Sequence, residues 1–259
     1  MKISNILDAI ERMAPLHLQD DYDNAGLQVG DPAAELTKVL VCLDMTEAVI
    51  DEAVAGGYNL VVSHHPLIFH PLRQVGAATW QQRCVTKAVR AGIVLYAAHT
   101  NLDNAPGGVS HQMAALLGLR HVRWLAPKPG VDAGAGVVGE LPAPVSRQEF
   151  LQQLQRVFKV RSLRHTPAEG TPVRTVALCG GAGAFLLPDA LRAGADCFVS
   201  GEFHYHDFFD GEGMLLACLG HYESEQYTQE LLRDIIVTAF PSVPVFRSAC
   251  GKNPVEVLV

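Results

Sequence analysis

Six side chains of metal-ligand type follow three hydrophobic runs of the sequence. They are His64 and His65 after NLVVS, His99 and Asp103 after GIVLYAA, and His221 and Glu225 after MLLACLG. Apolar runs of this length predict buried strands, and sites in open α/β sheets collect beyond the carboxyl ends of the strands. Histidine and carboxylate ligands together suit one or two divalent transition metals. We therefore expect the three groups to converge on one metal pocket.

The number of candidate ligands favours two metal ions over one. Any one of the three pairs, taken alone, is more often structural, but three pairs at strand ends together favour a metal site. Four histidines and two carboxylates exceed the needs of a tetrahedral zinc site. They suit two ions about 3.5–4 Å apart, with a bridging carboxylate and open positions for water. Zinc, iron, manganese and nickel are all candidates for these ions.

The residues around two of the pairs predict different local structures. HTNLD is followed by a proline and two glycines, so we expect His99 and Asp103 to lie in a loop and not in a helix. A helix is predicted to begin near Tyr222. His221 and Glu225, four residues apart, would then lie on one face of that helix.

Other polar residues are candidates for contacts with a substrate. Asp23 and Asn24 lie in a predicted loop, where they could bind a substrate or simply form a turn. Glu202 and His206 follow another apolar run and could act as an acid–base pair or orient the ligands. The segment CGGAG could bring backbone amides to a phosphate. It lacks the lysine of a P-loop, however, so a tight turn between a strand and a helix is the alternative.

The order of the predicted elements indicates an α/β fold. Strands alternate with helices in both halves of the chain, which is typical of parallel βαβ units. We predict a first α/β lobe over 1–125 with most of the ligands and a second lobe over 173–259 with the rest. Between them, 126–172 is rich in proline and is expected to be a connector with one small strand–helix unit. Ser146 is its predicted N-cap, and Glu149 completes a capping box.

A repeated spacing suggests that the two lobes are related by an internal duplication. Cys42 and Ser63 are 21 positions apart, as are Cys179 and Ser200. In this frame His65 lies over Glu202. The alternative is that βαβ units resemble one another in any case; a duplication would place equivalent strand ends around one site.

Composition and charge exclude several functional classes for this protein. The chain has 259 residues, 49% of them hydrophobic and 18% charged, which is enough for a large core. A net charge of −7 argues against a nucleic-acid backbone as the main partner. No apolar run approaches the roughly 20 residues of a membrane span, and the N-terminal segment lacks the long apolar stretch of a signal peptide. We expect a cytoplasmic protein with six reduced cysteines.

The motifs DNAGLQVG, SHHPLIF, HTNLD, CGGAG, SGEFHYH and GHYESE together resemble the GTP cyclohydrolase 1 type 2 homologue family, the Nif-three-like proteins. The resemblance runs nearly end to end and implies a dinuclear metal centre at the junction of two similar α/β lobes, within toroidal homohexamers. It implies metal ligands at His64, His65, Asp103, His221 and Glu225. His99 matches a position that binds or lines the centre in some members. The middle region is short, as in members without an inserted domain.

The leading hypothesis is a hydrolase or cyclohydrolase that uses two divalent metal ions. A metal-bound hydroxide would attack carbon or phosphorus of a small substrate, nucleotide-like or phosphorylated, with Glu202 or His206 moving protons. The family name suggests GTP, but no residue spacing selects it. The alternative is a metal-binding assembly protein without catalysis, acting as a scaffold, chaperone or sensor.

Overall fold

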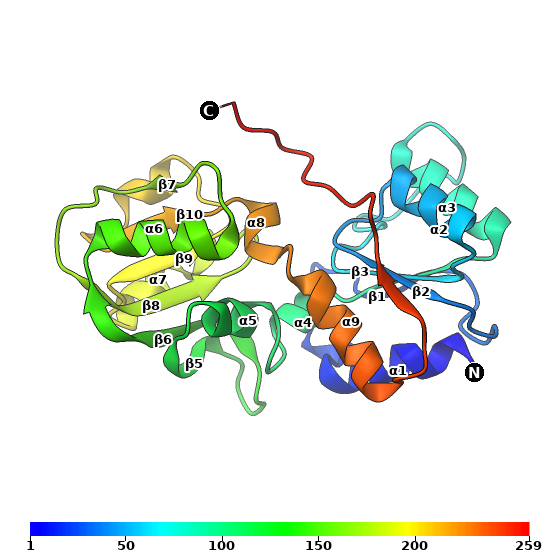
Figure 1. Ribbon diagram of the computed structural model, residues 1–259, viewed down its shortest axis with the longest axis horizontal. Coiled ribbons are helices and arrows are strands. Elements are labelled where there is room, and N and C mark those ends of the chain that lie inside the picture. Colours follow the sequence, from blue (N-terminus) through cyan, green and yellow to red (C-terminus); the bar gives the residue numbers. More distant parts are fainter. Residues whose placement is uncertain (259) are drawn as a thin grey trace. The chain divides into compact units, whose positions relative to one another are not determined.

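The computed structural model describes residues 1–258, which form two compact units (Figure 1). Unit 1 comprises Met1–Leu102 and Tyr227–Pro254. Unit 2 comprises Asp103–Gln226 and the described residues after Pro254. Each unit has its own sheet with helices packed on it, so the fold is mixed α/β with two sheets.

The sheet of unit 1 has five strands in the order β1-β4-β3-β2-β11. The strands are β1 (Gly26–Val29), β2 (Val39–Cys42), β3 (Leu60–Ser63), β4 (Val94–Ala97) and β11 (Val245–Arg247). Strand β3 pairs in parallel with β2 and β4, and β11 pairs in parallel with β2. Their carboxyl ends therefore meet at one edge of the sheet. Strand β1 pairs antiparallel with β4 and follows the predicted loop that contains Asp23 and Asn24.

Helices cover both faces of this sheet (Figure 1). They are α1 (Ile3–Met13), α2 (Glu47–Gly56), α3 (Trp80–Ala91) and α9 (Thr228–Ala239), with the short 3₁₀ turn η1 (Leu16–Leu18) after α1. Thr46 and Thr79 cap the first turns of α2 and α3 with their side chains. Leu40, Cys42 and Val61 pack with α2 and α3 in one hydrophobic core. Helices α1 and α9 lie on the other face of the sheet (Figure 1), toward which the alternate strand residues point.

The sheet of unit 2 has six strands in the order β5-β6-β8-β9-β10-β7. They are β5 (Arg120–Pro127), β6 (Gly134–Val145), β7 (Arg164–His165), β8 (Val173–Cys179), β9 (Cys197–Ser200) and β10 (Leu215–Cys218). Strand β9 pairs in parallel with β8 and β10. Strand β6 pairs antiparallel with β5 and β8, and β7 pairs antiparallel with β10. The predicted parallel units therefore form the centre of a larger mixed sheet.

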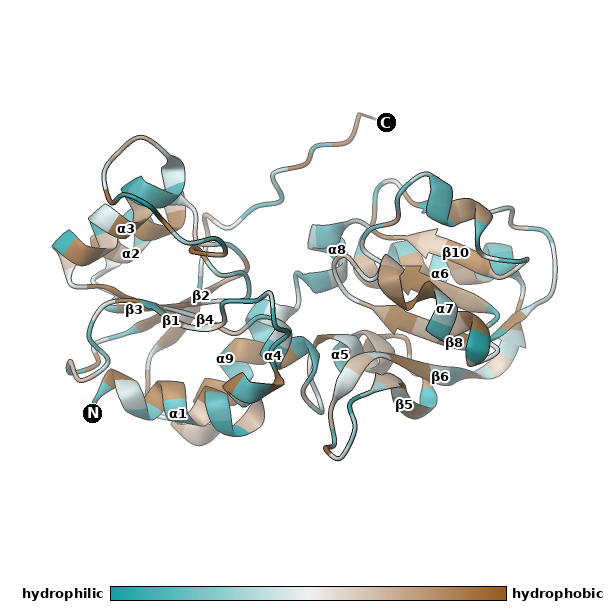
Figure 2. Cartoon of the chain, turned by 180° about the vertical axis from the view of Figure 1, so that it is seen from behind, coloured by the Kyte–Doolittle hydropathy of each residue, from teal (hydrophilic) through white to brown (hydrophobic). Residues whose placement is uncertain are grey.

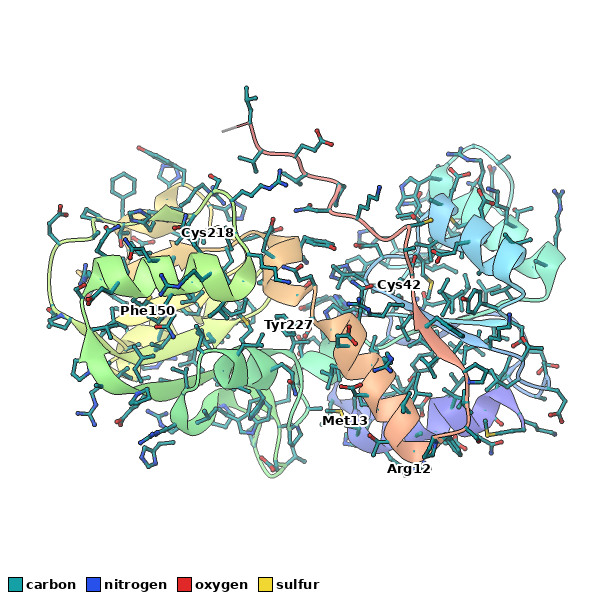
Figure 3. All side chains as sticks on the ribbon, viewed as in Figure 1. Arg12, Met13, Cys42, Phe150, Cys218 and Tyr227 are labelled. Atoms are coloured by element: carbon teal, nitrogen blue, oxygen red, sulfur yellow. The ribbon has the colours of Figure 1, made fainter. Side chains whose placement is uncertain are left out.

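Unit 2 contains helices and 3₁₀ turns of different lengths. They are α5 (Val109–Leu116), α6 (Arg147–Phe158), η2 (Ala184–Leu186), α7 (Leu187–Arg192), η3 (His206–Phe209) and α8 (His221–Glu225). Phe150 of α6, labelled in Figure 3, is fully buried. Ala190 of α7 and Phe198 of β9 belong to a hydrophobic core that also includes Leu216. Figure 2 shows the apolar colouring concentrated on the strands within each unit.

The middle of the chain belongs to the sheet of unit 2. Residues 126–172 include β6, which pairs with both β5 and β8, and the helix α6. The predicted strand–helix unit is present there, and Ser146 and Glu149 form the expected capping box. The compact units divide the chain at Leu102 and Gln226, at other places than the predicted lobes 1–125 and 173–259. The boundaries of the units depend on strands that are distant in the sequence but pair within one sheet.

The spacing of 21 residues that occurs twice in the sequence corresponds to the same pairing of neighbouring parallel strands in both sheets. Cys42 pairs with Ser63 across β2 and β3, and Cys179 pairs with Ser200 across β8 and β9. In each pair of strands the next residues leave the sheet at its carboxyl edge. Within the described residues, no helix is both long and apolar enough to cross a membrane.

Candidate metal centre

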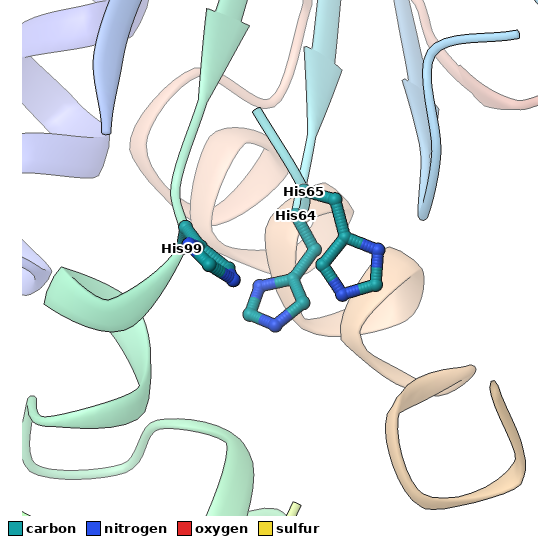
Figure 4. Close-up of side chains that lie close together, drawn as sticks. All are labelled: His64, His65 and His99. Atoms are coloured by element: carbon teal, nitrogen blue, oxygen red, sulfur yellow. The ribbon is translucent and has the colours of Figure 1, made fainter. Parts of the chain in front are cut away.

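Three histidines converge at the carboxyl edge of the sheet in unit 1. His64 and His65 follow β3, and His99 is the second residue after β4 (Figure 4). Each can offer one ring nitrogen such that the three atoms lie within 4.8 Å of one another. The ring centroids are 4.9 Å apart for His64–His65, 5.3 Å for His64–His99 and 5.5 Å for His65–His99. This spacing suits ligands of one ion or of two neighbouring ions.

A bend after Ser63 allows two adjacent histidines to share this site. Neighbouring residues of a regular strand would point to opposite faces. Here the strand ends at Ser63, whose hydroxyl donates to the carbonyl oxygen of His65 at 2.6 Å. The amide of His65 donates to the carbonyl of Leu43 at 3.0 Å. These contacts turn the backbone so that both rings lie on the same side.

Each of the three histidines has its Nδ1 atom in a hydrogen bond with an oxygen acceptor. His64 Nδ1 is 2.8 Å from the Ala98 carbonyl oxygen, His65 Nδ1 is 2.8 Å from Asp44 Oδ1, and His99 Nδ1 is 2.7 Å from Asp23 Oδ1. Since a carbonyl or ionised carboxylate only accepts hydrogen bonds, the hydrogen belongs on Nδ1. This leaves Nε2 as the candidate ligand nitrogen. Histidines that bind metals in proteins are oriented in the same way.

Asp23, predicted from the sequence as a substrate contact, lies fully buried against His99. Its side chain has 0% exposure, and it also accepts a hydrogen bond from the Thr100 amide at 3.0 Å. Burial alone would raise the pKa of Asp23, but the hydrogen bond and charge of His99, with the Thr100 bond, lower the pKa to about 2. Asp23 is therefore an anion that holds His99.

Asn24, the other predicted substrate contact, joins two loops. Its Nδ2 donates to the carbonyl oxygen of Ile68 at 2.6 Å. The amide of Ile68 in turn donates to Gln28 Oε1 at 3.1 Å. Asn24 thus fixes the loop before β1 against the segment that follows the histidine pair.

Unit 2 contains the carboxylate ligands and the fourth histidine. His221 and Glu225 begin and end α8, and His221 Nε2 is 3.1 Å from Glu225 Oε2, so they share one face as predicted. Glu225 is buried. Asp103 offers a carboxylate oxygen within 4.8 Å of one of Glu225. Carboxylates and imidazoles are typical ligands for a divalent cation.

Asp103 ends a short helix, α4 (Thr100–Asp103), where the sequence had predicted a loop. The prediction was wrong because two side chains cap this turn. Asn101 Oδ1 accepts the His99 amide at 2.9 Å, and Asp23 accepts the Thr100 amide. One of these caps comes from a residue 77 positions earlier in the chain, so local sequence could not reveal it.

Glu202 and His206, the predicted acid–base pair, have different surroundings. Glu202 Oε1 is 2.8 Å from His221 Nδ1, so it contacts the candidate ligand directly. His206 lies in η3, and its ring packs near Tyr205 and Phe209. Within the described residues, no hydrogen bond joins His206 to Glu202. Of the two roles considered for Glu202, its contact with His221 matches orientation of a ligand.

Two further residues of the site were not singled out from the sequence. Asp44 orients His65, and the signal that could have revealed it is an acid directly after the apolar run KVLVCL. Gly181 lies in CGGAG with a φ of +58°, and a Cβ there would overlap the Glu225 carboxylate and approach His221 Cε1 to 3.3 Å. The glycine therefore makes room for the ligand pair.

Comparison with known proteins identifies the family of this chain. The model of the Duf34/NIF3 (NGG1p interacting factor 3) family matches residues 1–254, a range that includes both sets of candidate ligands. The chain belongs to the DUF34/NIF3 family. A Lactococcus lactis protein named GTP cyclohydrolase 1 type 2 homolog is 33% identical over 256 residues, 98% of each chain.

Other DUF34/NIF3 relatives support the same assignment. A Clostridium acetobutylicum protein with the same name is 32% identical, over 87% of this chain and 85% of its own. A solved structure of a Staphylococcus aureus hypothetical protein has a TM-score of 0.90 at 26% identity, and covers 100% of this chain and 99% of that one. The family and the fold are thus shared over essentially the whole chain.

Proposed function

We propose that this DUF34/NIF3 protein is a metal-dependent hydrolase, and that the ligand sets of its two units together bind two divalent ions. The observation on which the proposal rests is the common orientation of His64, His65 and His99. All three have Nδ1 fixed by an oxygen acceptor, which directs Nε2 to the ligand role. A structural histidine needs no such uniform arrangement, whereas a metal ligand benefits from it in affinity and geometry.

The chemistry of the two sets supports their joint use. Unit 1 supplies three imidazoles, and unit 2 supplies Asp103 and Glu225 with His221. Carboxylates are the groups that can bridge two ions and offset their charge. The chain itself connects the sets, because α4 starts one residue after His99 and ends at Asp103. A dinuclear centre at the junction of the units is the arrangement that we propose.

The protein's own residues would support hydrolysis around such a centre. Divalent ions at these ligands would supply a water molecule of lowered pKa and polarise an oxygen of the substrate. Asp23, Asp44 and Glu202 would hold the ligand histidines in orientation. His206 is the remaining candidate for proton transfer, and Glu202, which is 53% exposed, could share that role.

We propose a small nucleotide-like or phosphorylated substrate. The name of the Lactococcus lactis relative refers to GTP, which makes GTP one of the compounds to test. Phosphate and carbonyl oxygens are the groups that a two-metal site binds best.

The remaining proposals concern ancestry and assembly. The equal registers of Cys42 with Ser63 and of Cys179 with Ser200 support an internal duplication. The family resemblance supports a cytoplasmic, ring-shaped homohexamer. Light scattering should then give about six times the chain mass of 27.9 kDa.

The proposed function can be tested by metal analysis followed by a hydrolysis screen. The protein is stripped with a chelator, reloaded separately with zinc, iron, manganese or nickel, and analysed by mass spectrometry for ions per chain. We expect two tightly bound ions with at least one of these metals, and hydrolysis within a panel of nucleotides and phosphoesters. His65→Ala should abolish the activity, whereas His17→Ala, at an exposed histidine of the same unit, should not.

Two outcomes would contradict the proposal in different ways. Fewer than one bound ion per chain after reconstitution would exclude the dinuclear centre. A metal-loaded protein that is inert across the panel would exclude hydrolysis of these compounds and favour a scaffold or sensor.

A further inference from the structure

Two aromatic side chains lie beside the three histidines of unit 1. The ring of Phe69 is 6.0 Å from the ring of His99, edge to face at 86°. The ring of Tyr22 is 6.4 Å from that of Phe69, at 65°. The three rings form a continuous row that begins at a candidate ligand and extends away from it.

The row is held in place by polar contacts. Asp23, the residue after Tyr22, is hydrogen-bonded to His99, which fixes the Tyr22 loop relative to the ligand. Asn24 donates to the carbonyl of Ile68, the residue before Phe69, and so joins the two loops. The Tyr22 hydroxyl also donates to Asp20 Oδ2 at 3.2 Å. The two rings are therefore parts of a preorganised surface.

The exposure of these rings differs from that of aromatic residues in the core. Tyr22 is 65% exposed and Phe69 is half-buried, whereas Tyr96 is fully buried. Rings at such positions keep an apolar surface available next to the metal ligands. Aromatic faces and edges attract other planar rings and discriminate against ligands that lack one.

We propose that Tyr22 and Phe69 form an aromatic wall that stacks against a planar, nucleobase-type ring of the substrate. The inference rests on the proposed function, because it assumes that the reacting group of the substrate lies at the histidines. It adds the substrate class: the compound contains a planar heteroaromatic ring beside its reacting group. Tyr22 and Phe69 are thus residues of specificity and are not metal ligands.

The test compares two probes that share a phosphate but differ in the ring. Guanosine 5′-monophosphate and ribose 5-phosphate are titrated into the zinc-loaded protein by calorimetry. We expect the nucleotide to bind about tenfold more tightly, the effect of one stacked base. Tyr22→Leu and Phe69→Leu should each remove most of this preference. Binding of ribose 5-phosphate and the number of ions per chain should not change.

A matched control is available in the same unit. Phe246 packs edge to face on Tyr58 at 5.7 Å, a ring pair of similar geometry and partial exposure. Phe246→Leu should keep the full preference for the nucleotide. Thermal unfolding of all variants checks that the loss of a ring has not unfolded the protein.

Guanosine and the metal-free protein separate this inference from the proposed function. Stacking needs no metal, so guanosine should bind the metal-free protein weakly in saturation-transfer NMR, and Tyr22→Leu should reduce the signal. Equal affinity of the zinc-loaded protein for the two phosphates, or a preference unchanged in both variants, would overturn the aromatic wall while leaving the metal centre intact. Absence of metal binding with guanosine still bound would overturn the hydrolase alone.

Discussion

The two units offer candidate metal ligands of different chemistry. Unit 1 presents three imidazoles, each oriented by an oxygen acceptor of its own unit. Unit 2 presents two close carboxylates with one histidine, and Gly181 leaves space for them. Neutral rings can pack together without a cation, whereas neighbouring carboxylates repel each other until a cation is bound. The arrangement of the histidines thus depends on the hydrogen bonds that orient their rings. The close approach of the carboxylates depends on a cation that compensates their charge.

The largest expected effect comes from removing one ligand from each set. His65→Ala and Glu225→Ala should both lower the affinity for metal by more than the roughly 10–100-fold that loss of an outer partner costs. Calorimetric titration of the stripped protein measures this. Asp189→Ala, which removes a surface carboxylate paired with Arg192, is the control and should have no effect.

A loss of metal affinity in only one of these variants would contradict the joint use of the two ligand sets. Two tightly bound ions in Glu225→Ala together with loss of metal in His65→Ala would mean that unit 1 binds metal without the carboxylates. The reverse result would make the histidine orientation irrelevant to metal binding.

A second effect concerns the carboxylate that orients His99. The pKa of Asp23 falls from 3.8 in the unfolded chain to about 2 in the folded one. A depressed folded pKa contributes stability above pH 3.8, which is lost as the pH falls through about 2. Asp23→Asn should therefore lower the free energy of unfolding of the metal-free protein by about 2 kcal/mol at pH 5.

Urea unfolding at two pH values checks this assignment. The difference between the native protein and Asp23→Asn should shrink when the pH is lowered from about 5 toward 2, because Asp23 becomes protonated in both states. A difference that stays constant with pH would show that the charge of Asp23 does not stabilise the His99 side of the site.

The smallest expected effect tests the space around the carboxylate set. Gly181→Ala introduces a Cβ that overlaps Glu225 at a positive φ of +58°. Gly194→Ala is the matched control, with a φ of +67° and no heavy atom within 4 Å of the added Cβ. Both changes should cost about 1 kcal/mol of stability from backbone strain. Gly181→Ala should cost about 1 kcal/mol more and also weaken metal binding.

Equal behaviour of the two glycine variants in both assays would show that CGGAG is only a turn. Weaker metal binding in Gly181→Ala alone would show that the glycine serves the ligands. Circular dichroism melting and calorimetry supply the two measurements.

Several elements could be predicted because their signals are local. The helix α3, Trp80–Ala91, follows a threonine cap at Thr79 and ends at Gly92 in the left-handed conformation, and both are signals that can be read from the sequence. The run NLVVS forms β3, and the pair His221 and Glu225 shares one face of α8. Apolar periodicity and capping residues lie within a few positions of the structure that they determine.

Other features could not be predicted because they depend on contacts between distant segments. The strand β1 exists only through its antiparallel pairing with β4, and α4 is capped by Asp23. The roles of Asp44 and Glu202 became clear from their contacts with His65 and His221. A hydrogen bond across 19 to 77 residues leaves no periodic pattern in the sequence.

The sequence by itself determined the chemical inventory of this protein: ligand-type residues after apolar runs, helix caps, and the motifs of its family. Those properties follow from residue type and short-range spacing. Only the tertiary structure decided which acceptor orients each histidine, that Gly181 makes room for Glu225, and that Tyr22 and Phe69 line up beside His99. These arrangements arise when strands far apart in the chain pair and bring their carboxyl ends to one edge of a sheet.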